Sequence, residues 1–144
     1  MDKILATCLF MSAHLYSVPP AVLTGIYHVE GGRIGQEVGP NSNGTYDLGP
    51  MQINTSWLPL LASHWGVSQA TARRWVRDDA CTNAGVAAWI VRENLNETRD
   101  LGTAIAYYHS RTPYYNEPYR AKVIGVMKRD GLILTSDTRT ESKP

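Results

Sequence analysis

The sequence predicts a mainly helical domain of the α+β class, with one small irregular or hairpin insertion. Apolar residues recur at helical spacing through most of the chain, and capping residues or glycines stand where the pattern stops. Residues 33–54 interrupt this pattern with glycine, proline and asparagine, a composition that fits turns or a small hairpin. At 144 residues the chain is long enough for one domain with its own core.

The first helix is expected from about Ile4 to Leu15. Within it, Ile4, Cys8, Met11 and Leu15 fall on one stripe, which we expect to face the core. The same run follows Asp2 and could be the apolar core of a short signal peptide. No small residues mark a cleavage point, so we favour a first helix and find no evident export signal in this chain.

The second helix is expected to begin at Pro19-Pro20 and to run to Glu30, where Gly31-Gly32 supply a left-handed stop. Further helices follow the insertion, and an apolar run around Trp89 predicts a buried central helix. One of these helices is expected from Leu58 to Trp65, with Gly66 as its stop, and a short one through Val76 has Ser68 as its N-cap. Asp100 is expected to cap the next helix, and a last helix should run from about Glu117 to Lys128.

The predicted domain covers residues 1–130, and residues 131–144 are expected to form a flexible tail. A formal net charge of +1 gives no electrostatic reason to expect nucleic acid as a partner. No apolar run has the length of a membrane span. Three arginines, Arg73, Arg74 and Arg77, are interpreted as a solvated helix face.

Two carboxylic residues carry the functional hypothesis. Glu30 ends an apolar helix, where the helix dipole and apolar neighbours both oppose its ionisation, so we expect a raised pKa. Asp47 lies in a polar, turn-rich segment, so its pKa should differ from that of Glu30. Acid-catalysed glycosidic cleavage requires two carboxyl groups whose pKa values are separated in this way. Two unrelated surface carboxylates are the alternative, and Asp47 could instead cap the turn at Asn43-Gly44.

Two segments resemble known families. Residues 44–57 read GTYDLGPMQINTSW and resemble a segment of the C-type lysozymes and of the SLT-type lytic transglycosylases. Residues 104–113 read AIAYYHSRTP and, with Tyr119 and Val123, resemble the distal motif of the small transglycosylases of secretion, conjugation and pilus machines. The resemblance runs from about Cys8 to about Met127.

The resemblance implies a lysozyme-like fold with a cleft between the helical part and the small lobe. It also implies cleavage of the β-1,4 bond between N-acetylmuramic acid and N-acetylglucosamine in peptidoglycan, with formation of a 1,6-anhydro ring. Glu30 would act as the acid and then as the base, while Asp47 or the substrate's N-acetyl group would stabilise the cationic intermediate.

Further residues are expected to contact substrate. Gln52 and Asn54 alternate in a stretch that we expect to be extended, so both amides should face the glycan. Met51 is a weaker candidate, because the same alternation turns it toward the core. The distal motif adds Tyr108, His109 and Ser110. Gly31 departs from the family pattern, since many relatives have a serine after the catalytic glutamate.

The two cysteines, Cys8 and Cys81, leave two readings open from the residues alone, namely buried free thiols or a disulfide. The periplasmic relatives often tie the first helix to a later one with such a pair, so the resemblance implies a disulfide and a periplasmic location. It also implies proteins of a secretion, conjugation or pilus apparatus as possible partners.

Two other functions remain open at this stage. A hydrolytic muramidase would use Glu30 and Asp47 with water as the acceptor, and a wall-binding assembly factor would keep the groove without activity. No cofactor is expected, because His14, His28, His64 and His109 have no metal-ligand spacing and no phosphate-binding or nucleophile motif is present.

Overall fold

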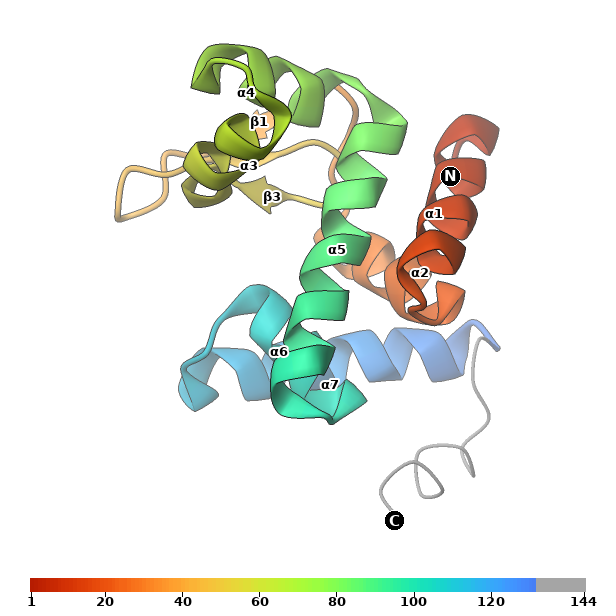
Figure 1. The fold of residues 1–144 in the computed structure, drawn as a ribbon. Coiled ribbons are helices and arrows are strands. Elements are labelled where there is room, and N and C mark those ends of the chain that lie inside the picture. Colours follow the sequence, from red (N-terminus) through yellow and green to blue (C-terminus); the bar gives the residue numbers. More distant parts are fainter. Residues whose placement is uncertain (132–144) are drawn as a thin grey trace.

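Seven α-helices and one small antiparallel sheet make up the fold in the computed structural model, which describes residues 1–131 (Figure 1). The mainly helical α+β prediction is therefore confirmed. The elements are α1 (Lys3–Tyr16), α2 (Pro20–Glu30), β1 (Glu37–Val38), β2 (Asp47–Leu48), β3 (Ile53–Asn54), a 3-10 helix (Thr55–Trp57), α3 (Leu58–Trp65), α4 (Gln69–Asp78), α5 (Ala80–Thr98), α6 (Leu101–His109) and α7 (Pro113–Arg129).

Helix α5 is the central element. It lies between α1 and α2 on one side and the sheet, α3 and α4 on the other (Figure 1). Its packing with α1, α4 and α6 buries apolar residues around the helix, as the run around Trp89 predicted. The buried residues of α5 are Asn83, Ala84, Val86, Ala87, Ala88, Ile90, Val91 and Asn94.

Local capping signals set the ends of most helices as predicted. The Ser68 side chain accepts from the backbone N–H of Thr71, and Asp100 accepts from that of Thr103. Gly31 and Gly66 both adopt the left-handed conformation and end α2 and α3.

The predicted buried face of α1 is wrong. Ile4, Met11 and Leu15 are 69%, 60% and 75% exposed, and only Cys8 of that stripe is buried. The buried face instead consists of Leu5, Cys8, Leu9, Ser12 and Ala13. Apolar residues lie on both faces of this helix, so spacing alone does not choose between them, and the face that starts at Leu5 is the one that packs on α5.

The last helix begins earlier than predicted. Thr112 is the N-cap of α7 and Pro113 occupies the first turn, where a missing N–H is tolerated. Pro118, next to the predicted start at Glu117, lies inside the helix. The predicted flexible tail, apart from Gly131, lies outside the described residues.

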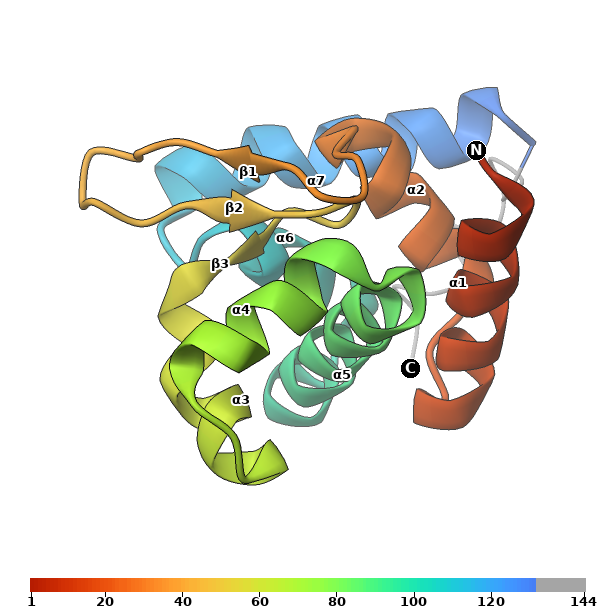
Figure 2. The ribbon, with the colours of Figure 1, turned by 90° about the horizontal axis from the view of Figure 1, so that it is seen from above.

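The insertion forms a sheet of three two-residue strands in the order β1-β2-β3. Asp47 pairs with Val38 on one side and with Asn54 on the other. Figure 2 shows the strands on one side of the molecule and α1 on the opposite side. The prediction of turns or a small hairpin is confirmed.

Ion pairs attach this sheet to α4. Arg73 and Arg77 both donate to the carboxylate of Glu37 on β1, at 2.7 and 2.9 Å. The Arg73 guanidinium also lies 5.3 Å from the ring centre of Tyr46. Two of the three arginines therefore hold the sheet in place, where the sequence predicted only a solvated face.

A disulfide between Cys8 and Cys81 joins α1 to the first turn of α5. The pairing agrees with the expectation drawn from the resemblance, and the two cysteines are 73 positions apart. Within residues 1–131, no helix combines the length and the apolar character that crossing a membrane requires.

Candidate active site

A polar cavity of about 500 Å³ lies between the sheet, the end of α2 and the end of α6. It gathers the side chains that the sequence assigned to a site, with Met51 as the exception. The lining residues are Glu30, Asn41, Ser42, Asn43, Thr45, Asp47, Gln52, Ile53, Asn54, Ser56, Trp57, Ile90, Tyr107, Tyr108, His109, Ser110 and Arg111.

Glu30 is positioned by a close contact between the end of α2 and the turn before β3. The N–H of Gly32 donates to the carbonyl of Pro50 at 3.2 Å. A Cβ at Gly32 would lie 2.0 Å from the carbonyl oxygen of Gly49, so only glycine permits this approach. The glycine pair therefore both ends α2 and brings Glu30 to the wall of the cavity.

The surroundings of Glu30 raise its pKa to about 7. Burial is the largest cause, since it disfavours the charged carboxylate. The hydroxyl of Tyr119 acts in the opposite direction, and the negative charge of Asp47 raises the pKa further. Glu30 can therefore hold a proton near neutral pH and release it to a base, as a general acid must.

Tyr119 is the most important neighbour that the site assignment missed. It comes from α7, is 6% exposed, and its hydroxyl is the one buried side-chain polar atom without a hydrogen-bond partner within residues 1–131. The hydroxyl influences Glu30 without reaching full hydrogen-bond geometry in this structure. Its signal in the sequence was its place after the distal motif, which gave no reason to assign it a role.

Asp47 is held by two amide side chains. Asn54 Nδ2 donates to one carboxylate oxygen at 3.0 Å, and Asn41 Nδ2 donates to the other at 3.3 Å. The turn is capped by Asn43 instead, whose side-chain oxygen accepts from the backbone N–H of Thr45. Asp47 therefore presents a fixed carboxylate to the cavity, and turn capping does not explain its position.

The turn before β3 differs from the extended stretch that the sequence predicted. Gln52 adopts φ +53°, and its Nε2 donates to the carbonyl of Gly49 at 2.9 Å. Met51 is fully buried, so its side chain cannot contact a ligand and its assignment to substrate binding was wrong. Its carbonyl accepts from the hydroxyl of Tyr108 at 2.7 Å.

Asn83 on α5 holds the same turn through buried hydrogen bonds. It is completely buried; its Oδ1 accepts from the N–H of Met51, and its Nδ2 donates to the carbonyls of Leu48 and Val76. Both the carbonyl oxygen and the amino group of this side chain are hydrogen-bonded, which fixes the loop between β2 and β3. Asn83 directly precedes the apolar run around Trp89, and the sequence gave no sign of this contact.

The wall opposite the sheet comes from the end of α6 and the residues after it. Arg111 forms a bidentate pair with Glu97, and its guanidinium lies 4.7 Å from the ring centre of Tyr107. Trp57 packs edge-on against Trp89, with ring centres 5.5 Å apart. Trp57, Tyr107 and Arg111 therefore give the polar cavity both aromatic and charged walls.

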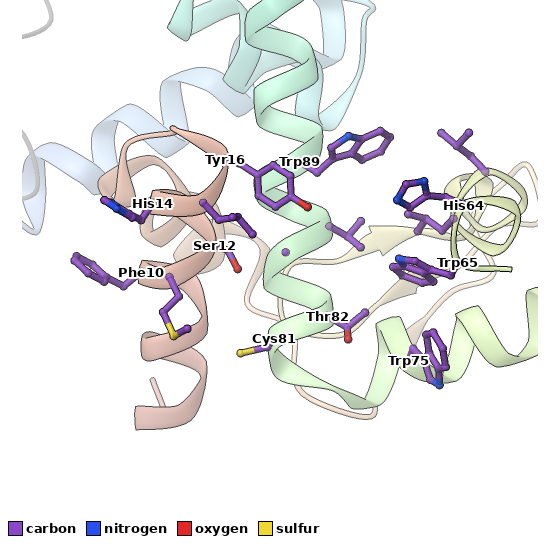
Figure 3. Close-up of a pocket in the computed structure, with 16 residues that line it drawn as sticks. Phe10, Ser12, His14, Tyr16, His64, Trp65, Trp75, Cys81, Thr82 and Trp89 are labelled. Atoms are coloured by element: carbon purple, nitrogen blue, oxygen red, sulfur yellow. The ribbon is translucent and has the colours of Figure 1, made fainter. Parts of the chain in front are cut away.

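A second, larger cavity lies elsewhere on the molecule. It measures about 830 Å³ and runs between α1 and α3/α4, over α5 (Figure 3). Its walls are mostly apolar and include Trp65, Trp75 and Trp89, and no carboxyl group lines it. Both candidate carboxyl groups, Glu30 and Asp47, therefore line the polar cavity.

In comparisons with known proteins, the chain matches no family model and no curated protein. Within the described residues, no group of three or more His, Cys, Asp or Glu side chains could hold a metal ion.

Proposed function

We propose that this protein is a peptidoglycan lytic transglycosylase with a lysozyme-like fold. It cleaves the β-1,4 bond between N-acetylmuramic acid and N-acetylglucosamine, and Glu30 is the catalytic acid and base. The observation that carries this proposal is a half-buried glutamic acid with a pKa of about 7 in a polar cavity that Asp47 also lines.

In the first step the carboxylic acid of Glu30 gives its proton to the glycosidic oxygen, and the bond from that oxygen to C1 of the muramyl sugar breaks. The carboxylate of Asp47 faces the positive charge that develops on the sugar ring. In the second step Glu30 takes the proton of the C6 hydroxyl while O6 bonds to C1, which closes the 1,6-anhydro ring without water.

The amide groups of Gln52 and Asn54 line the same cavity and suit the N-acetyl and hydroxyl groups of the substrate. Asn54 already donates to Asp47 and to Thr45, so it acts on the substrate partly by orienting the carboxylate. Sequence resemblance to the SLT-type enzymes supports the choice of peptidoglycan.

A hydrolytic muramidase is the second candidate, and the fixed carboxylate of Asp47 favours it. Retaining glycosidases use two carboxyl groups, and the second attacks or stabilises the sugar while water is the final acceptor. The chemistry differs only in whether the C6 hydroxyl or water reaches C1.

By the same resemblance, we propose that the protein acts in the periplasm on local wall glycan, beside a secretion, conjugation or pilus apparatus. The disulfide supports an oxidising compartment, since such bonds persist there and are rare in the cytosol.

Mass spectrometry of digested sacculi tests the function. Anhydromuramyl ends are expected for a transglycosylase and reducing ends for a muramidase. Glu30→Gln keeps the shape of the side chain and should lower the rate by about 100-fold or more, the usual size of a general-acid contribution. Wild-type turnover in this variant would contradict the assignment of Glu30.

A further inference from the structure

One residue that lines the polar cavity, His109, belongs to an aromatic pair that the proposed mechanism does not use. His109, at the end of α6, stacks on Tyr119 of α7 with ring centres 4.8 Å apart and planes 11° from parallel. One side of the imidazole therefore covers the tyrosine ring, while the rest of His109 is exposed and lines the cavity.

The backbone on both sides of this stack is held in place. The buried amide of Asn116, in the first turns of α7, donates to the carbonyl of Ser110 at 2.9 Å. This bond fixes the short connection between α6 and α7, so the two rings have little freedom to move apart. The geometry of the stack therefore follows from the packing of α6 against α7.

The stack determines where the Tyr119 hydroxyl lies. That hydroxyl is buried, has no other partner within residues 1–131, and sits beside Glu30. A tyrosine hydroxyl in this place can donate to the carboxylate that remains after Glu30 has given up its proton. Its position therefore affects the reaction even though it touches no reacting bond.

We propose that His109 is a positioning residue: its imidazole stacks on Tyr119 and so holds the tyrosine hydroxyl against the carboxyl group of Glu30. The catalytic consequence of this inference rests on the proposed function, whereas the stacking of His109 on Tyr119 does not depend on it. His109 acts through Tyr119 and not primarily as a sugar-binding group.

The surroundings of His109 lower the pKa of its imidazole. Burial lowers the pKa of His109, Asp47 across the cavity opposes that shift, and Lys122 on α7 adds to it. Since the ordinary pKa of histidine is already about 6.5, the ring carries little charge near pH 7. An aromatic ring without charge should therefore replace it.

Four variants test the role in catalysis: His109→Ala, His109→Phe, Tyr119→Phe and the double variant His109→Ala/Tyr119→Phe. We expect His109→Ala to lower kcat by about tenfold with KM within about twofold, and His109→Phe to recover most of that loss. The double variant should be no slower than Tyr119→Phe alone, because both changes remove the same interaction. Additive losses, or a rise in KM with unchanged kcat, would show that His109 binds substrate directly.

A second readout needs no turnover. Carbon-13 NMR of the Glu30 carboxyl should show its pKa rise by up to about one unit in Tyr119→Phe and in His109→Ala, because the hydroxyl that opposes the shift is lost or displaced. His109→Phe should leave the pKa where it is. An unchanged or lowered pKa in His109→Ala would overturn the inference.

The two readouts separate this inference from the proposed function. If the wild-type protein cleaves no peptidoglycan, the function fails and the NMR titration still tests the stack. His64→Ala is the matched control, because His64 lines the apolar cavity and should change neither the rate nor the pKa of Glu30.

Discussion

Glu30 and Asp47 line one cavity in different surroundings. Glu30 is half-buried, and the buried hydroxyl of Tyr119 lies beside it. Asp47 stands on a strand and accepts from the amides of Asn41 and Asn54. A partly desolvated acid beside a hydrogen-bonded carboxylate is the arrangement that allows two carboxyl groups to take different roles.

The raised pKa of Glu30 has a cost in stability with a defined pH window. The folded-state pKa is about 7 against 4.5 when unfolded, so the cost is absent below pH 4.5, grows between pH 4.5 and 7, and is complete above. Glu30→Gln should therefore raise the free energy of unfolding at pH 8 by up to about 3 kcal/mol. Denaturant titrations at pH 4 and pH 8 measure this, and an equal effect at both would contradict it.

Asp47→Asn separates the two enzymatic readings. If Asp47 stabilises the cationic sugar, the rate should fall by about 100-fold while fragments of peptidoglycan still bind, because the amide cannot offset positive charge. Removing the carboxylate also lowers the pKa of Glu30, so the alkaline limb of the pH–rate profile should move to lower pH. Activity within a few-fold of wild type, with anhydro products, would assign catalysis to Glu30 alone.

At the scale of elements, the site depends on the turn between β2 and β3, which three helices contact. The N–H of Gly32, just after α2, donates to Pro50; the hydroxyl of Tyr108 on α6 donates to Met51; and the buried amide of Asn83 on α5 accepts from Met51. Helices α2, α5 and α6 thus all meet one short segment of the small lobe.

Gly32→Ala should separate α2 from this turn. The added Cβ would lie 2.0 Å from the Gly49 carbonyl oxygen and 2.6 Å from Gln52 Nε2. We expect a loss of about 3 kcal/mol in the free energy of unfolding, with a loss of activity. Gly31→Ala is the control, because its Cβ meets nothing within 4 Å and costs only about 1–2 kcal/mol for the left-handed conformation. Equal melting temperatures for the two variants would refute this account.

Helix ends were predictable from the sequence because their causes are local. Ser68, Asp100 and Gly66 act within one turn of where they stand. The buried face of α1 was not predictable, because both of its faces are apolar and packing on α5 decides between them. Within the site, Tyr119 and Asn83 lie far along the chain from their partners, so no spacing rule could reveal their contacts.

At the scale of the whole molecule, α5 connects the two parts of the fold. Its first turn carries Cys81, which is bonded to Cys8 on α1, and Asn83 one half-turn later holds the small lobe. The disulfide therefore anchors the helix that supports the site without lining the polar cavity itself.

Reduction of the disulfide should lower the free energy of unfolding by about 4 kcal/mol in the chain-entropy model, and the melting temperature with it. Turnover well below that temperature should be retained. Calorimetry with and without reductant measures the effect, and the Cys8→Ser/Cys81→Ser variant should show the lower temperature and no response to reductant. Two free thiols in unreduced protein from an oxidising compartment would contradict the bond.

The separation of the site residues along the chain also has a consequence for the order of folding. Glu30 and Tyr119 come from opposite ends of the described chain, and contacts of long sequence separation form late because loop closure must come first. During synthesis the acid is made long before the helix that encloses it. The surroundings that let Glu30 keep its proton at neutral pH are therefore complete only once α7 has docked on α2. Under the proposed function, a growing chain cannot yet cleave glycan.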